Sequence, residues 1–168
     1  MMVYCLPIDK KDVAMEDELV IRRAKFNDLN FLEDIMMESL GYWGYSDVQL
    51  SKLKNRLGIS QELIQNSVIY VALINNEIAG FWVRELRNNL YEVEVFIKQK
   101  FIKKNIGTRL WKYATNNLKE EHHLEYITFI SDANAQGFYE KMGAIKIDEQ
   151  ISEEVPGKML PVMKYYLK

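Results

Sequence analysis

The apolar residues of the chain recur with two different spacings, which predict strands and helices along its length. Alternating or continuous apolar runs predict strands at 18–25, 67–74, 77–87, 90–98, 124–130, 144–150 and 158–168. Apolar residues three or four positions apart predict helices at 26–41, 46–57, 104–120 and 133–143. The predicted order of elements is therefore β, α, α, β, β, β, α, β, α, β, β.

Capping residues set the expected ends of the first two helices. Asn27 or Asp28 can cap the start of the first helix, and Gly41 is the expected end. Ser46, followed by Gln49 three residues later, forms the pattern of a capping box at the start of the second helix. These signals place a glycine- and aromatic-rich loop, GYWGYS, between the two helices.

The order of elements also predicts the sheet. The strand at 90–98, the helix at 104–120 and the strand at 124–130 form a βαβ unit, so these two strands should be parallel. Asn-Asn pairs at 75–76 and 88–89 predict tight turns between antiparallel neighbours. We therefore expect an α/β fold with a mixed, mostly antiparallel central sheet, helices on both faces and one parallel βαβ unit.

Composition narrows the class of protein. The chain has 168 residues, a formal charge of −2 and one cysteine, with no apolar run of the ~20 residues that span a bilayer. These features predict an N-terminal arm at 1–18, which either pairs as a strand or stays mobile, and one domain at 19–168. The single cysteine and the lack of a long apolar run lead us to expect a soluble, cytoplasmic protein that does not bind membranes. We also expect no nucleic-acid binding, because binding phosphate backbones needs a basic surface.

A cationic junction, KQKFIKKNIGT, lies between the strand at 90–98 and the following helix. A helix N-terminus attracts anions, because its first N–H groups are unpaired and its dipole is positive there. Lys103 and Lys104 add charge, Asn105 and Gly107 permit unusual backbone angles, and Thr108 adds a hydroxyl. The residues alone leave two interpretations open, an anion site and an ordinary solvated turn. The glycine patterns of nucleotide-binding loops are absent.

Two segments resemble the GNAT superfamily of acyl-CoA-dependent N-acetyltransferases. VFIKQKFIKKNIGTRLWKYA is similar to its acyl-CoA-binding segment, and SDANAQGFYEKMGAIKI is similar to its second conserved segment. The resemblance implies a GNAT-like fold and acetyl-CoA as co-substrate. It implies that the strand residues Val95, Phe96 and Ile97 bind pantetheine, and that Tyr139 lies near the thioester sulfur. It further implies that the cofactor is bound by two groups of residues. The loop contributes Lys103, Lys104, Asn105, Ile106, Gly107 and Thr108, and the second segment contributes Asp132 and Asn134.

The chain departs from the family pattern at several positions. Ile102 stands where the pattern has Arg or Gln, and Asn105 stands where it has its first glycine. Gln99 replaces a common proline, Asp132 occupies the usual asparagine position, and Ala144 replaces an aromatic residue.

The resemblance implies direct transfer of an acetyl group from the thioester to a primary amine of a small molecule or peptide. Tyr139 is the expected general acid, because a phenol keeps its proton at neutral pH; the alternative is that it only packs at the end of its helix. Glu92 or Glu94 is the expected base. A backbone N–H near Ile97 is the expected hydrogen-bond donor to the oxyanion. Equally, both glutamates can face solvent. No metal is required.

The aromatic residues Tyr42, Trp43 and Tyr45 are candidates for contacting the acceptor, since the corresponding region borders the acceptor site in similar proteins; packing is the alternative. The expected partners are acetyl-CoA and an amine acceptor, and a homodimer is possible. A second hypothesis is a non-catalytic acyl-CoA-binding sensor or interaction module with the same fold.

Overall fold

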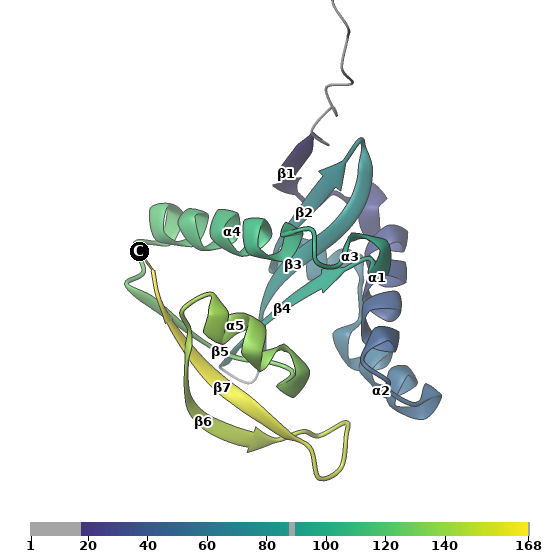
Figure 1. Ribbon diagram of the computed structural model, residues 1–168, viewed down its shortest axis with the longest axis vertical. Coiled ribbons are helices and arrows are strands. Elements are labelled where there is room, and N and C mark those ends of the chain that lie inside the picture. The colour runs from purple at the N-terminus through teal and green to yellow at the C-terminus, as the bar shows by residue number, and fades with distance from the viewer. Residues whose placement is uncertain (1–17, 88–89, 168) are drawn as a thin grey trace, which may run out of the picture.

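The computed structural model describes residues 18–87 and 90–167 (Figure 1). Within these residues seven strands form one sheet in the order β1-β2-β3-β4-β5-β7-β6. The strands are β1 (Leu19–Arg23), β2 (Val68–Ile74), β3 (Glu77–Arg87), β4 (Leu90–Ile97), β5 (Tyr126–Ile130), β6 (Ile145–Ile151) and β7 (Met159–Tyr166). The α-helices are α1 (Leu29–Tyr42), α2 (Asp47–Leu57), α3 (Gln61–Asn66), α4 (Ile106–His122) and α5 (Gln136–Lys141). Short 3-10 turns are η1 (Phe26–Asp28), η2 (Gln99–Phe101) and η3 (Ala133–Ala135).

The sheet is mixed, as predicted. Strands β4 and β5 are parallel, and the helix α4 connects them. The other neighbouring strands within the described residues are antiparallel. The turn at 75–76 is confirmed, because Asn75 and Asn76 both have positive φ. The predicted turn at 88–89 and the predicted arm lie outside the described residues, apart from Glu18.

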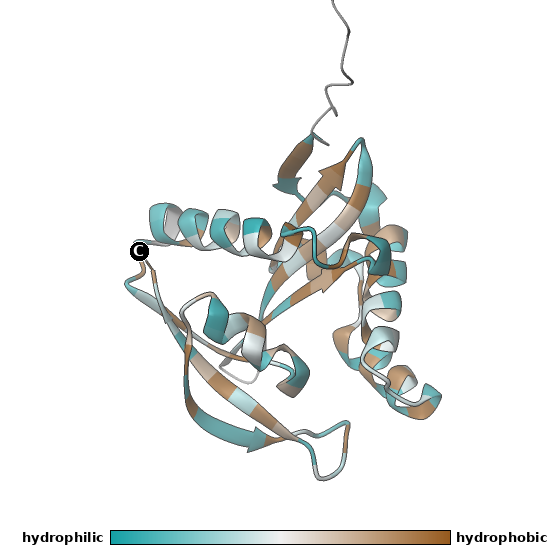
Figure 2. Ribbon diagram, viewed as in Figure 1, coloured by the Kyte–Doolittle hydropathy of each residue, from teal (hydrophilic) through white to brown (hydrophobic). Residues whose placement is uncertain are grey.

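Helices cover both faces of the sheet, as expected. Helices α1 to α3 lie on one side and α4 and α5 on the other (Figure 1). The two faces bury separate apolar clusters, and the central strands β2 to β4 carry many of the hydrophobic residues (Figure 2). The sequence neighbours Phe81 and Trp82 are therefore both fully buried, one in each cluster.

The predicted capping is right for the second helix and wrong for the first. The Ser46 N–H donates to Gln49 Oε1 over 2.9 Å, which confirms the capping box. Helix α1 continues through Gly41, which lies inside the helix with a negative φ. The Asp28 side chain does not cap α1 and instead pairs with Arg22 at 2.7 Å. The same carboxylate accepts the Lys25 N–H at 2.7 Å, so it caps the 3-10 turn η1 that leads into α1.

Among the described residues, no helix combines the length and the hydrophobicity needed to cross a lipid bilayer.

Candidate active site

The start of β4 pairs with the end of β5. The parallel register joins Tyr91 to Phe129 and Glu92 to Ile130. Beyond this point β5 ends while β4 continues to Ile97, so the edge of β4 faces a gap within the sheet. A gap of this kind gives an extended ligand access to main-chain hydrogen-bonding groups.

The alternation of hydrogen bonds along β4 decides which residues face the gap. The Val93 carbonyl accepts a hydrogen bond from the Tyr139 hydroxyl at 2.9 Å, on the β5 side. Lys98 N–H instead donates to the Ala79 carbonyl at 2.9 Å, on the β3 side. The odd-numbered residues Val95 and Ile97 therefore direct their backbone groups toward the gap. Phe96, two residues before Lys98, directs its backbone groups toward β3 instead.

The cationic junction leads into α4 through two residues with left-handed backbone angles. Lys103 has a φ of 66° and Asn105, the residue before the helix, has a φ of 60°. Asn105 makes no side-chain cap, so the first N–H groups of α4 keep their capacity for another partner. A Cβ on Gly107 would lie 3.4 Å from the Phe138 ring, an ordinary van der Waals contact, so helix α4 begins close to α5. Helix α4 begins at 106 rather than 104, because the left-handed Asn105 cannot continue the helix.

The gap and the start of α4 together border a cavity of about 400 Å³. The structure brings most of the predicted cofactor residues to this cavity: Val95, Ile97, Lys103, Asn105, Ile106, Gly107, Thr108 and Asn134. Tyr139, Tyr42 and Trp43 also line it. Three predicted cofactor residues do not line it. Phe96 is buried in the opposite cluster, Lys104 lies over the Phe101 ring at 5.4 Å, and Asp132 borders a neighbouring pocket.

Tyr139 is fully buried at the inner end of this cavity. Burial raises the pKa of its phenol well above the usual value, and the negative charges of Glu94 and Asp132 add to the rise. The phenol therefore keeps its proton at neutral pH and can donate it.

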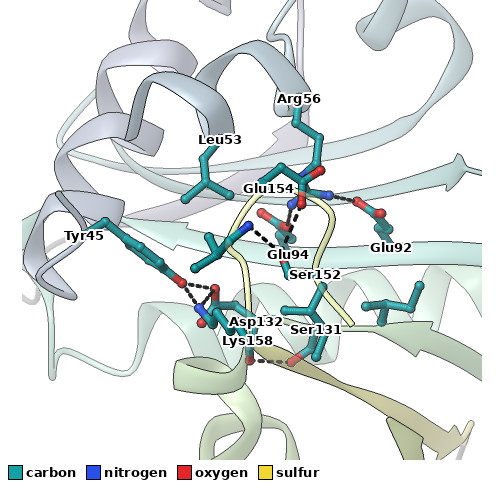
Figure 3. Close-up of a pocket in the computed structure, with 13 residues that line it drawn as sticks. Tyr45, Leu53, Arg56, Glu92, Glu94, Ser131, Asp132, Ser152, Glu154 and Lys158 are labelled. Atoms are coloured by element: carbon teal, nitrogen blue, oxygen red, sulfur yellow. Dashed lines mark hydrogen bonds and ion pairs between the residues drawn. The ribbon is translucent and has the colours of Figure 1, made fainter. Parts of the chain in front are cut away.

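Glu92 and Glu94 lie on the other face of β4, where helix α2 covers them. Arg56, in the last turn of α2, contacts Glu92, Glu94 at 3.2 Å and Glu154 at 3.2 Å (Figure 3). Burial alone would lower the pKa of Arg56, but the three carboxylates outweigh it and hold that pKa above its usual value. The two strand glutamates therefore line a charged pocket instead of an open face of the sheet.

The environment of Glu94 alters its acidity. Burial raises the pKa of Glu94 to about 7, Glu92 and Asp132 add to the rise, and Arg56 opposes it. A carboxyl with this pKa exchanges protons readily near neutral pH. Glu94 also borders the same small cavity, of about 40 Å³, as Tyr139 and Asp132, whereas Glu92 does not. The geometry thus favours Glu94 over Glu92 as the base.

A second polar group closes the far end of the charged pocket. Lys158, from the loop between β6 and β7, contacts Asp132 at 2.7 Å and donates to the Tyr45 hydroxyl. The Tyr45 hydroxyl donates to Asp132 in turn, and Asn134 N–H donates to the same carboxylate over 2.7 Å. Burial raises the pKa of Tyr45, with Asp132 as the next cause, so its hydroxyl stays protonated.

Three cavities therefore follow one another through the molecule. The large cavity shares Tyr139 and Val95 with the small one, and the small one shares Glu94 and Asp132 with the charged pocket. The Tyr139 phenol and the Glu94 carboxyl both line the small cavity that joins the large cavity to the charged pocket. This arrangement suits the transfer of a group between two bound molecules.

The family comparison agrees with this geometry. Residues 37–157, well over half of the chain, match the family model described as "Acetyltransferase (GNAT) domain". The protein belongs to the GNAT acetyltransferase family. A search among curated protein sequences finds no significant match.

Solved structures of GNAT proteins share the fold. PaiA N-acetyltransferase from Thermoplasma acidophilum, in complex with coenzyme A, aligns with a TM-score of 0.73 at 18% identity, covering 89% of this chain and 99% of that one. A GCN5-related N-acetyltransferase from Rhodopseudomonas palustris aligns with a TM-score of 0.72 at 15% identity, covering 88% and 95%. The ribosomal-protein-S18-alanine N-acetyltransferase from Escherichia coli aligns with a TM-score of 0.65 at 13% identity, covering 89% and 94%. These likenesses establish the GNAT fold.

The predicted aromatic residues divide between the two sides of this GNAT site. Tyr42 and Trp43 line the large cavity, where their rings contact each other edge to face at 5.3 Å. Tyr45 lines the charged pocket. The three residues therefore do not form one cluster, because α1 ends at Tyr42 and the chain then turns toward α2.

Sequence reasoning did not identify three residues of the charged pocket: Arg56, Glu154 and Lys158. Arg56 is typical of the solvated side of an amphipathic helix, and the other two lie in a loop next to a Pro-Gly turn. Their interactions form only when α2 and the β6–β7 loop meet over β4, so no local pattern signals them.

Proposed function

We propose that this GNAT protein transfers the acetyl group of acetyl-CoA directly to a primary amine of a small molecule or peptide. One observation carries the proposal: the cavity along the open edge of β4 meets a carboxylate-lined pocket at Tyr139 and Glu94. A donor on one side and an acceptor on the other would thus meet between a proton donor and a base.

The large cavity fits coenzyme A. The backbone groups of Val95 and Ile97 face the gap and can pair with the amides of the pantetheine arm. The N–H groups at the start of α4 and the Lys103 ammonium suit the diphosphate. When bound there, acetyl-CoA supplies an activated acetyl group as a thioester.

Glu94 and Tyr139 divide the proton transfers. Glu94 removes a proton from the acceptor ammonium, so that the neutral nitrogen attacks the carbonyl carbon. The backbone N–H near Ile97 stabilises the negative charge that develops on the carbonyl oxygen. The carbon–sulfur bond then breaks, and Tyr139 protonates the departing thiolate. The proton that the nitrogen releases on forming the amide replaces the one that Tyr139 has given up.

A non-catalytic acyl-CoA sensor is the competing proposal. The observation that favours it is the hydrogen bond of Tyr139 to the Val93 carbonyl, which must break or rearrange before the phenol can protonate a thiolate.

Release of free thiol from acetyl-CoA in the presence of a panel of amines separates the two proposals. The enzyme releases thiol with at least one amine, and Tyr139→Phe lowers the rate by about 100-fold or more. Tyr166→Phe is the matched control, because Tyr166 is exposed on β7, and it should leave the rate unchanged. Tight coenzyme A binding without turnover of any amine would instead support the sensor.

A further inference from the structure

The charged pocket already holds a cation of its own. The Lys158 ammonium lies 2.7 Å from Asp132, contacts the Tyr45 hydroxyl, and stands 4.3 Å from the centre of the Tyr45 ring (Figure 3). A carboxylate, a hydroxyl and an aromatic face together make a complete ammonium-binding site.

This site lies one step beyond the reacting groups. Lys158 and Tyr45 line the charged pocket but not the small cavity that Tyr139 and Glu94 share. Asp132 borders both. An acceptor whose amine reaches Glu94 therefore brings its neighbouring atoms toward Asp132 and Tyr45.

The charged pocket has almost no free space. Its cavity of about 20 Å³ holds little more than a water molecule. An acceptor that extends into this pocket must displace a side chain. Lys158 is the side chain best suited to move, because it lies in a loop and not in a helix or strand. Removal of the Lys158 ammonium leaves the partly buried carboxylate of Asp132 with hydrogen-bond donors but without its cationic partner, which is costly. An entering cation offsets this cost.

The balance of charge points the same way. The residues that line the pocket carry four carboxylates, on Glu92, Glu94, Asp132 and Glu154, against the two cations of Arg56 and Lys158. An acceptor that brings positive charge is therefore favoured, and one that brings a carboxylate is disfavoured.

We propose that the acceptor carries a second cationic group besides its reacting amine, and that this group takes the place of the Lys158 ammonium on Asp132 and Tyr45. The proposal rests on the proposed acetyltransferase function and specifies its substrate class as diamines or amines with a comparable second cation.

A series of primary amines of one chain length tests the proposal: 1,4-diaminobutane, butylamine, 4-aminobutanol and 4-aminobutyrate, each with acetyl-CoA. The value of kcat/KM should be about 10- to 100-fold higher for 1,4-diaminobutane than for butylamine, as expected for a charge-assisted contact. The aminobutyrate should be the poorest substrate. Higher homologous diamines, run in parallel, locate the optimal spacing.

Variants of the ammonium-binding site distinguish its role from a structural one. Asp132→Asn keeps an oxygen for the Asn134 N–H but removes the charge. The ratio of kcat/KM for 1,4-diaminobutane to kcat/KM for butylamine should therefore fall toward one. Glu149→Gln, on the exposed strand β6, is the matched control and should retain the preference. Lys158→Met removes the competing cation and should lower KM for the diamine. A merely structural Lys158 would give a raised or unchanged KM.

Equal kcat/KM for 1,4-diaminobutane and butylamine, with acetyl transfer intact, would overturn the proposal and leave the proposed function standing. If no amine of the series is acetylated, calorimetric binding of 1,4-diaminobutane and butylamine to the coenzyme A complex decides. Tighter binding of the diamine supports the proposal, and equal binding overturns it. Failure to bind coenzyme A would refute the proposed function itself.

Discussion

At the scale of single residues, the environment gives different properties to two glutamates on one strand. Glu92 and Glu94 both contact Arg56, yet Glu94 also borders the cavity that contains Tyr139. Burial and the neighbouring carboxylates raise the pKa of Glu94 to about 7, which matches the need of a general base near neutral pH.

The pH dependence of the reaction should report this pKa. Because the base acts when deprotonated, kcat/KM should rise about tenfold per pH unit below about 7 and level off above it. Glu94→Gln should lower kcat by about 100-fold or more and abolish this rise, whereas Glu92→Gln should retain it. Steady-state kinetics between pH 5 and 9 provide the measurement. Persistence of the rise in Glu94→Gln would remove Glu94 from the mechanism.

Arg56 is the cation on which three carboxylates depend, so its removal should destabilise the fold. Arg56→Met should lower the free energy of unfolding by about 3 kcal/mol at pH 8, because buried charges lose their partner. The loss should be smaller at pH 5, because Glu94, whose pKa is raised to about 7, is then protonated and no longer needs a cationic partner. Urea unfolding at the two pH values measures this.

Lys54→Met is the control, because Lys54 lies in the same helix and pairs with Glu33 at the surface. It should change stability little. Equal effects of the two substitutions would show that the Arg56 cluster contributes no more than an exposed pair.

At the scale of elements, the entry into α4 depends on an unusual backbone. Asn105 adopts a left-handed conformation at the position where the GNAT pattern has glycine. Asparagine is one of the few other residues that tolerate this conformation, so the anion-binding turn can survive the departure from the pattern.

Substitutions at Asn105 should therefore follow backbone preference. Asn105→Gly should preserve or slightly raise stability, and Asn105→Val should lower it by about 1–2 kcal/mol. Thermal unfolding of the two variants beside the unmodified protein is the test. A valine variant as stable as the glycine variant would contradict a left-handed Asn105.

The elements themselves could be predicted from sequence, because apolar spacing reflects the two covered faces of the sheet directly. The first helix shows where local signals fail: Gly41 continues α1, and the Asp28 side chain binds Arg22 and the Lys25 N–H instead of capping α1. In the large cavity, short contiguous motifs identified most of the lining residues. In the charged pocket, Arg56 and Lys158 come from distant segments, and only tertiary packing brings them together.

At the scale of the whole molecule, the strand β4 lies between two regions, the large cavity and the charged pocket. Its edge and odd-numbered residues face the large cavity, whereas Glu92 and Glu94 on the opposite face line the charged pocket. Where β5 ends and β4 continues, the small cavity connects the two regions at Tyr139 and Glu94. In the proposed function, this break in the sheet provides both the site for the donor and its route to the acceptor.

Coenzyme A should stabilise the folded protein, because a ligand that binds only the native state raises its stability. At about 100 times the dissociation constant, the gain should be about 2.7 kcal/mol, visible as a higher Tm. Pantetheine, which lacks the diphosphate, should give a smaller shift at the same concentration. Identical shifts would exclude a diphosphate contact.

Titration calorimetry of the protein with coenzyme A tests the central claim most directly. The account predicts saturable binding of coenzyme A. The double substitution of Lys103→Glu and Lys104→Glu should weaken the binding of coenzyme A far more than the binding of pantetheine. The matched pair Lys112→Glu with Lys119→Glu, on the exposed side of α4, should leave both affinities unchanged. Absence of heat and of saturable affinity for coenzyme A would contradict the account.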